Sequence, residues 1–174
     1  MMTAAKKQGG ADLQHDIVEA LRGELQEYGA LLALFDDQQR AILAREADRV
    51  LEIGEAIEAQ IDLTHRRRKQ REGFVQAIAK ASGKAGERAL GKLLDIFPAP
   101  SRVLVEALMD EVNRLIAQVR RRSKQNQMLL ARHVEVTQQI LQRANPESVG
   151  ATYSAQGKLK LKAAAPSRRL VDRG

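Results

Sequence analysis

The chain has 174 residues, no cysteine, no tryptophan and a formal net charge of +7 at pH 7. The lack of cysteine excludes a disulfide framework and a zinc site built on thiolates. Aromatic residues make up only 3% of the chain, so a core has to come from Leu, Ile, Val and Ala, which suits long helices in shallow contact. No apolar run approaches the roughly 20 residues of a membrane span, and residues 1–10 lack the apolar segment of a secretory signal. We therefore expect a soluble protein in a reducing, cytoplasmic setting.

The N-terminal part of the chain predicts a lead-in and a first helix. Residues 1–11 are small and polar, and we expect them to be disordered. Apolar residues then recur at steps of three and four, which predicts an amphipathic helix. Its apolar seam is Leu13, Ile17, Leu21, Leu25, Tyr28, Leu32 and Phe35. Asp36 and Asp37 predict its end, because Asp is a good N-cap for the helix that follows.

A second helix is expected over residues 38–81. Its seam contains small residues that permit a close neighbour: Leu43, Ala47, Val50, Gly54, Ile57, Ile61 and Thr64. A basic run at residues 66–71 follows before the apolar spacing resumes at Val75. Ser82, Gly83 and Gly86 predict the end of this helix.

A short apolar piece and a long third helix come next. Residues 87–97 carry Leu90, Leu93, Leu94 and Ile96, and Pro98 and Pro100 end this piece. Ser101 is the expected N-cap of a helix that continues to Arg143 without proline or glycine. Its seam has coiled-coil spacing and consists of Val105, Leu108, Val112, Leu115, Val119, Arg122, Asn126, Leu129, His133, Val136 and Ile140. The polar break at Arg122 and Asn126 either fixes the register of the helices or marks a binding position.

The last part of the chain has a different composition. Asn145 and Pro146 stop the third helix, and residues 145–174 are rich in Gly, Ser, Ala and Lys, which predicts a flexible basic tail. The domains are therefore a disordered lead-in (1–11), a helical body (12–144) and the tail (145–174). The predicted fold is all-α: an elongated, coiled-coil-like antiparallel hairpin or bundle of three main helices, with a short extra helix and a disordered C-terminal tail.

The charge pattern favours antiparallel pairing of the second and third helices. If they turn near residue 90, the basic residues at 67–71 face the acidic residues 110–111, and the arginines at 120–122 face the acidic residues between 55 and 62. Each basic cluster would then meet an acidic one. Single exposed pairs contribute only about 0 to 1 kcal/mol, so the register could slip.

Catalytic and metal-binding patterns are weak. Asp12 with His15 and Asp62 with His65 put a carboxylate and an imidazole on one helix face, a spacing that di-iron bundles use with Glu in place of Asp. Three arginines follow His65 directly, which is a poor setting for a dication. The sequence has no glycine-rich phosphate loop and no nucleophile elbow. We therefore expect no enzyme, no metal and no cofactor.

The basic runs at residues 66–71 and 120–124 are the groups that a nucleic-acid binder would use. Acidic residues are interspersed on the same helices, aromatic residues for base stacking are lacking, and no nucleic-acid-binding motif is present. We therefore expect no nucleic-acid partner and assign these runs to solvated or helix-pairing faces.

The end of the third helix and the residues after it form a recognisable pattern. Residues 126–130 read Asn-x-x-Leu-Leu, apolar spacing continues to residues 140–141, Pro146 breaks the helix, and residues 153–157 read Tyr-x-x-x-Gly before a basic end. This order resembles the FlgN-type flagellar export chaperones, and the resemblance covers residues 12–160.

The resemblance implies a cytoplasmic chaperone of flagellar type III export. Such a protein holds hook-filament junction proteins, the hook-associated proteins, in soluble form and delivers them to the membrane protein of the export gate. The resemblance assigns client binding to the C-terminal part of the third helix, at Asn126, Leu129, Leu130, Val136, Ile140 and Leu141. It assigns docking to the export gate to Tyr153 and Gly157.

The physical chemistry of the third helix agrees with this role. A terminal helix of a secreted protein is amphipathic and self-associates when exposed, so a chaperone without ATP has to cover it with an apolar helical groove. The apolar residues between 129 and 141 spread over a wider arc than one seam buries. Either this surface is free for a client, or the N-terminal helix folds back over it.

Two other functions stay open at this point. One is a structural coiled-coil component of a secretion apparatus, and the other is a small basic helical nucleic-acid-binding protein. The long seam could also pair with a second copy of the chain in a homodimer.

Overall fold

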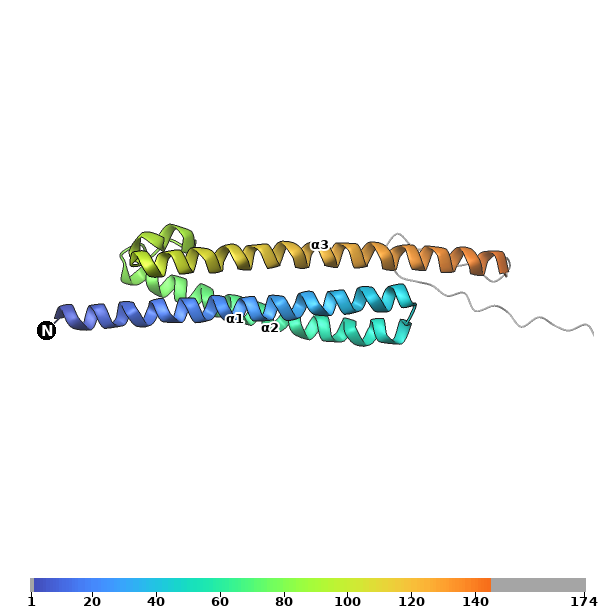
Figure 1. Ribbon diagram of the computed structural model, residues 1–174, viewed down its shortest axis with the longest axis horizontal. Helices are drawn as coiled ribbons and strands as arrows, with labels where there is room; N and C mark the ends of the chain where they lie inside the picture. The colour runs from blue at the N-terminus through green and yellow to red at the C-terminus, as the bar shows by residue number, and fades with distance from the viewer. Residues whose placement is uncertain (1, 145–174) are drawn as a thin grey trace, which may run out of the picture. The chain divides into compact units, whose positions relative to one another are not determined.

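In the computed structural model, the described residues 2–144 form three long α-helices and one short 3-10 helix, with no strand in this range. The helices are α1 (Met2–Ala44), α2 (Ala47–Ala81), η1 (Leu90–Ile96) and α3 (Ala99–Ala144). The chain divides into two compact units, residues 1–128 and residues 129–174. In the first unit, α1, α2 and the first part of α3 run in alternating directions (Figure 1). The predicted all-α bundle of three main helices with a short extra helix is confirmed.

The turn between α1 and α2 lies at Arg45 and Glu46. Arg45 has a left-handed φ of 61°, and its amide donates to the carbonyl of Ile42 at 3.1 Å. The predicted boundary at Asp36 and Asp37 was wrong, because α1 continues to Ala44. No glycine or proline interrupts residues 38–44, and the extra turns bury Ile42 in the first unit. At the other end, α1 begins at Met2, where the sequence predicted a disordered lead-in.

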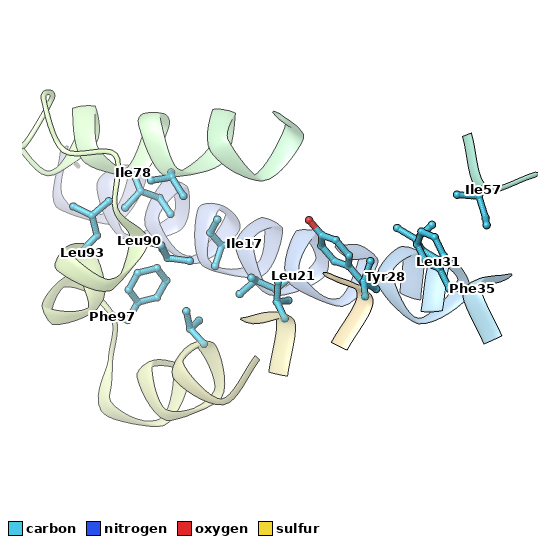
Figure 2. Close-up of a cluster of buried hydrophobic side chains, with 14 of the residues drawn as sticks. Ile17, Leu21, Tyr28, Leu31, Phe35, Ile57, Ile78, Leu90, Leu93 and Phe97 are labelled. Atoms are coloured by element: carbon cyan, nitrogen blue, oxygen red, sulfur yellow. The ribbon is translucent and has the colours of Figure 1, made fainter. Parts of the chain in front are cut away.

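The apolar core of the first unit draws on all four helices. All seven predicted seam residues of α1 are buried or half-buried. Figure 2 shows α1 side chains such as Ile17 and Phe35 in one cluster with Ile57 and Ile78 of α2 and with Leu90 and Leu93 of η1. Two positions of the predicted second seam were wrong. Leu43 belongs to α1 and is 62% exposed, and Ala47 begins α2 at the exposed turn.

Helix ends in the second half of the first unit follow local signals. α2 ends at Ala81 as predicted, and Gly83 follows with a left-handed φ of 76°. η1 places Leu90 and Leu93 in the core. α3 begins at Ala99, so the predicted N-cap, Ser101, lies inside its first turn. The reason is that the carbonyl of Pro98 already accepts the amide of Arg102 at 2.9 Å. Among the described helices, none is long and apolar enough to cross a membrane.

Candidate functional site

The seam of α3 changes character along the helix. In the first unit, Val105, Val112 and Val119 are buried at every second turn, and Leu108 and Leu115 are half-buried on the turns between them. This part of the seam packs into the core as a coiled-coil seam does. It holds the helix and leaves little apolar surface for a partner.

The polar break in the seam joins α3 to α1. Asn126 is 1% exposed, and its Nδ2 donates to the carbonyl oxygen of Phe35 at 2.7 Å and to Oε1 of Gln38 at 3.0 Å. One helical turn earlier, Nε of Arg122 lies 2.5 Å from Oδ1 of Asp36. Buried polar groups with specific partners favour one register over others. The polar break therefore helps to fix the register of α3 against α1.

Asn126 consequently differs from the other residues of the predicted client site. Its amide nitrogen is engaged inside the first unit, and its side chain has almost no solvent-exposed surface. We therefore do not assign Asn126 to the candidate client surface.

The described part of the second unit is the helix at residues 129–144, which carries an exposed apolar surface. Val134, Val136, Ile140 and Leu141 are 52%, 45%, 60% and 56% exposed, and Leu129 and Leu130 are half-buried. We call these six residues the apolar strip. At 100° of rotation per residue they occupy an arc of about 160° on the helix. His133 and Thr137 lie between its two rows, and the Thr137 hydroxyl donates to the carbonyl of His133 at 2.8 Å.

The remaining face of this helix is polar. Arg132, Glu135, Gln138, Gln139 and Gln142 are all exposed there. Nε2 of Gln139 donates to Oε1 of Glu135 at 3.4 Å. The helix is thus amphipathic with its apolar face exposed, a geometry suited to binding a second amphipathic helix side by side. Five of the six predicted client residues belong to this strip. Val134, which the sequence analysis missed, continues the row of Leu130 and Leu141.

Charge pairing in the first unit differs from the prediction. Arg71 does not face residues 110–111; its Nε lies 2.5 Å from Oε1 of Glu24, whose side chain is fully buried. Nε of Arg67 lies 3.3 Å from Oε1 of Glu27. Both acidic partners come from α1 and not from α3.

The second predicted contact was also wrong. Arg122 pairs with Asp36 of α1 and not with the acidic residues between 55 and 62. Exposed pairs are too weak to set a register, so apolar packing decides which helices meet. One sequence signal could have found the buried pair: Glu24 lies on the apolar face between Leu21 and Tyr28, where a carboxylate needs a cationic partner.

Asp62 and His65 are exposed on α2, and within residues 13–144 no group of three or more His, Asp and Glu side chains is arranged to hold a metal ion. Tyr153 and Gly157, assigned to gate docking, lie outside the described residues, as does the predicted tail at 145–174.

Comparison with known families identifies the class of the protein. A family model described as FlgN protein matches residues 13–160. Searches of curated proteins and of solved structures returned no match. The matched range includes α1 from residue 13 onward, α2, and all of α3 with its apolar strip. Because this match spans most of the chain, the protein belongs to the FlgN family of flagellar export chaperones.

Proposed function

We propose that this chaperone binds a terminal amphipathic helix of a hook-associated protein on the apolar strip of α3 and releases it at the flagellar export gate. The observation that carries the proposal is the set of four aliphatic side chains, Val134, Val136, Ile140 and Leu141, that stay about half exposed on one face of residues 129–144. Scattered single apolar residues on a surface are ordinary, but a contiguous apolar patch marks an interaction site.

The energy available from this surface suits reversible binding. Fully burying one Val, Leu or Ile side chain contributes about 1.5–3 kcal/mol relative to full exposure. Because the four side chains are already partly covered, a client helix would gain on the order of 3–6 kcal/mol from them. Association costs at least about 4 kcal/mol, so the client's own contacts have to supply the rest. A chaperone that must later release its client needs this balance.

The FlgN membership supports the choice of client and of location. Chaperones of this family bind hook-associated proteins, and we propose that this one does so in the cytoplasm. We further propose that Tyr153 and Gly157 contact the membrane protein of the export gate. This part of the proposal rests on the family pattern alone.

Co-expression with the terminal helix of a hook-associated protein tests the client site. Ile140→Asp with Leu141→Asp places two charges on the apolar strip and should abolish the soluble one-to-one complex. The matched control is Gln138→Asp with Gln142→Asp, which adds the same charges to the opposite, exposed face of the helix and should retain the complex. All four positions are exposed, so both variants should show the helix content and thermal midpoint of the parent.

Two outcomes would contradict the proposal. One is a complex that survives the strip variant, and the other is a complex lost equally in both variants. Tyr153→Ala separates the two proposed steps, because it should retain the complex while reducing secretion of the client. Pairing with a second copy would instead appear as a dimer of the free chaperone that the strip variant dissociates.

A further inference from the structure

The two basic runs of the sequence converge on one pocket of the first unit. Arg68 and Arg71 of α2 and Arg120 of α3 line it together with Tyr28 of α1 and Asn113 of α3. The pocket has a volume of about 320 Å³, and Ile116 and Ala117 complete its wall. Gathering three guanidinium groups in one place is unfavourable unless negative charge offsets their repulsion.

Two of the three arginines are held by carboxylates through one nitrogen only. Nε of Arg68 donates to Oε1 of Glu72 at 2.9 Å, and Nε of Arg71 donates to Oε1 of Glu24 at 2.5 Å. Within residues 13–144, the terminal nitrogens of both groups have no hydrogen-bond partner. A guanidinium has five N–H donors, so each group is oriented by its carboxylate and keeps donors free for a ligand.

Arg120 adds a charge that the protein does not balance locally. It is exposed at the pocket, and no carboxylate of the described chain lies within ion-pair distance of it. Glu24 and Glu72 offset the charges of Arg71 and Arg68. The pocket therefore has a net positive charge with donors that face it from two helices.

Tyr28 adds a hydroxyl group to the lining of the pocket. The residue is 8% exposed and lines the pocket, and its hydroxyl is not among the buried side-chain atoms that lack a hydrogen-bond partner, so it is accessible from the pocket. Burial and then the carboxylate of Glu24 raise the pKa of Tyr28, while the nearby arginines act in the opposite direction. The hydroxyl is therefore protonated at neutral pH and able to donate. A ligand in the pocket can accept a hydrogen bond from this hydroxyl.

We propose that this pocket binds a phosphate group, held by the terminal nitrogens of Arg68, Arg71 and Arg120 and by the hydroxyl of Tyr28. Arginine is suited to phosphate because its planar fork can donate two parallel hydrogen bonds to the anion. The donors come from three helices around the pocket. A tetrahedral anion accepts from several directions, whereas a planar carboxylate offers two oxygens in one plane. The ligand is therefore inorganic phosphate or a small phosphate monoester.

Calorimetric titration of the full chain with inorganic phosphate at constant ionic strength tests this site. Saturable binding is expected. Arg120→Gln should weaken it roughly tenfold or more, because it removes charge-assisted hydrogen bonds. Tyr28→Phe should also weaken it while keeping the ring that packs in the core. Lys124→Gln is the matched control, since this exposed residue of α3 does not line the pocket, and it should leave phosphate affinity unchanged.

Several results would overturn the proposal. These are the absence of saturable binding, an equal loss of affinity in Lys124→Gln, and binding of acetate as tight as that of phosphate at the same ionic strength. A parallel titration with glycerol phosphate compares a phosphate monoester with the free ion. The ligand that binds more tightly identifies the class, and tighter binding of either one supports the site. The proposal is independent of the client site, so Ile140→Asp with Leu141→Asp should bind phosphate as the parent does.

Discussion

Removing Arg71 is expected to destabilise the first unit strongly. The Glu24 carboxylate beside it is completely buried, and its Oε2 has no hydrogen-bond partner among the described residues. In Arg71→Met, this buried carboxylate would lose the guanidinium 2.5 Å away. Breaking a buried ion pair from one side costs about 3–5 kcal/mol. Since a domain is typically stable by about 5–15 kcal/mol, this single change should remove a large share of the free energy of unfolding.

Urea unfolding followed by far-ultraviolet circular dichroism at pH 7 measures the effect. Arg68→Met is the matched control, because Arg68 lies on the same helix and pairs with Glu72 in an exposed i,i+4 contact. It should cost no more than about 0.5 kcal/mol. The double variant Glu24→Leu with Arg71→Met removes both charges and should recover most of the lost stability. Equal costs for the two single arginine variants, or no recovery in the double variant, would refute the reasoning.

Two further changes test local features of the first unit. Gly29→Ala should raise the free energy of unfolding by about 0.5–1 kcal/mol, because a Cβ there meets nothing within 4 Å and glycine is a poor helix former. Gly83→Ala should lower the free energy of unfolding by about 1–2 kcal/mol, since the φ of 76° at Gly83 is strained for any side chain. Urea titrations measure both changes, and the same sign for both would contradict the explanation. Glu87 has its pKa lowered from 4.5, first by the Ala89 amide that donates to it at 3.0 Å. Its stabilising contribution is therefore present above pH 4.5 and lost as the pH falls below that value through its folded pKa. Glu87→Gln should make the urea midpoint fall less on acidification than in the parent, whereas Glu106→Gln, at an exposed position of α3, should not.

Much of the fold could be predicted because local signals coincide with tertiary packing. Gly83 ends α2 where a left-handed residue is needed, and the uninterrupted seam from Val105 to Val119 indicates a long helix that packs on one face. The boundary at Asp36 failed because Asp is ambiguous between a cap and an exposed helix position. In the folded unit, Asp36 instead pairs with Arg122 across helices.

The pairing of charges could not be predicted for a physical reason. The sequence shows which residues are charged, but exposed pairs stabilise a register by too little to choose it. Placing α1 against the arginines of α2 depends on the apolar packing of Ile17, Leu21 and Tyr28, which charge patterns do not report. The pocket at Tyr28 follows from that placement, so it was not visible in the sequence. The apolar strip was visible in the sequence, since its residues lie close together along one helix.

The order of features along α3 explains how one helix can both hold the bundle and offer a surface. A purely apolar seam could slide against its neighbour, which would change which aliphatic residues are buried. Sliding would separate Asn126 from the Phe35 carbonyl, 2.7 Å away, and leave a buried amide without its partner, at a cost of about 1–3 kcal/mol. The contact of Arg122 with Asp36 adds little to this preference, because the two side chains are 35% and 44% exposed. The buried Asn126 contact therefore fixes where the buried seam ends, and the aliphatic residues that follow it on α3 stay exposed.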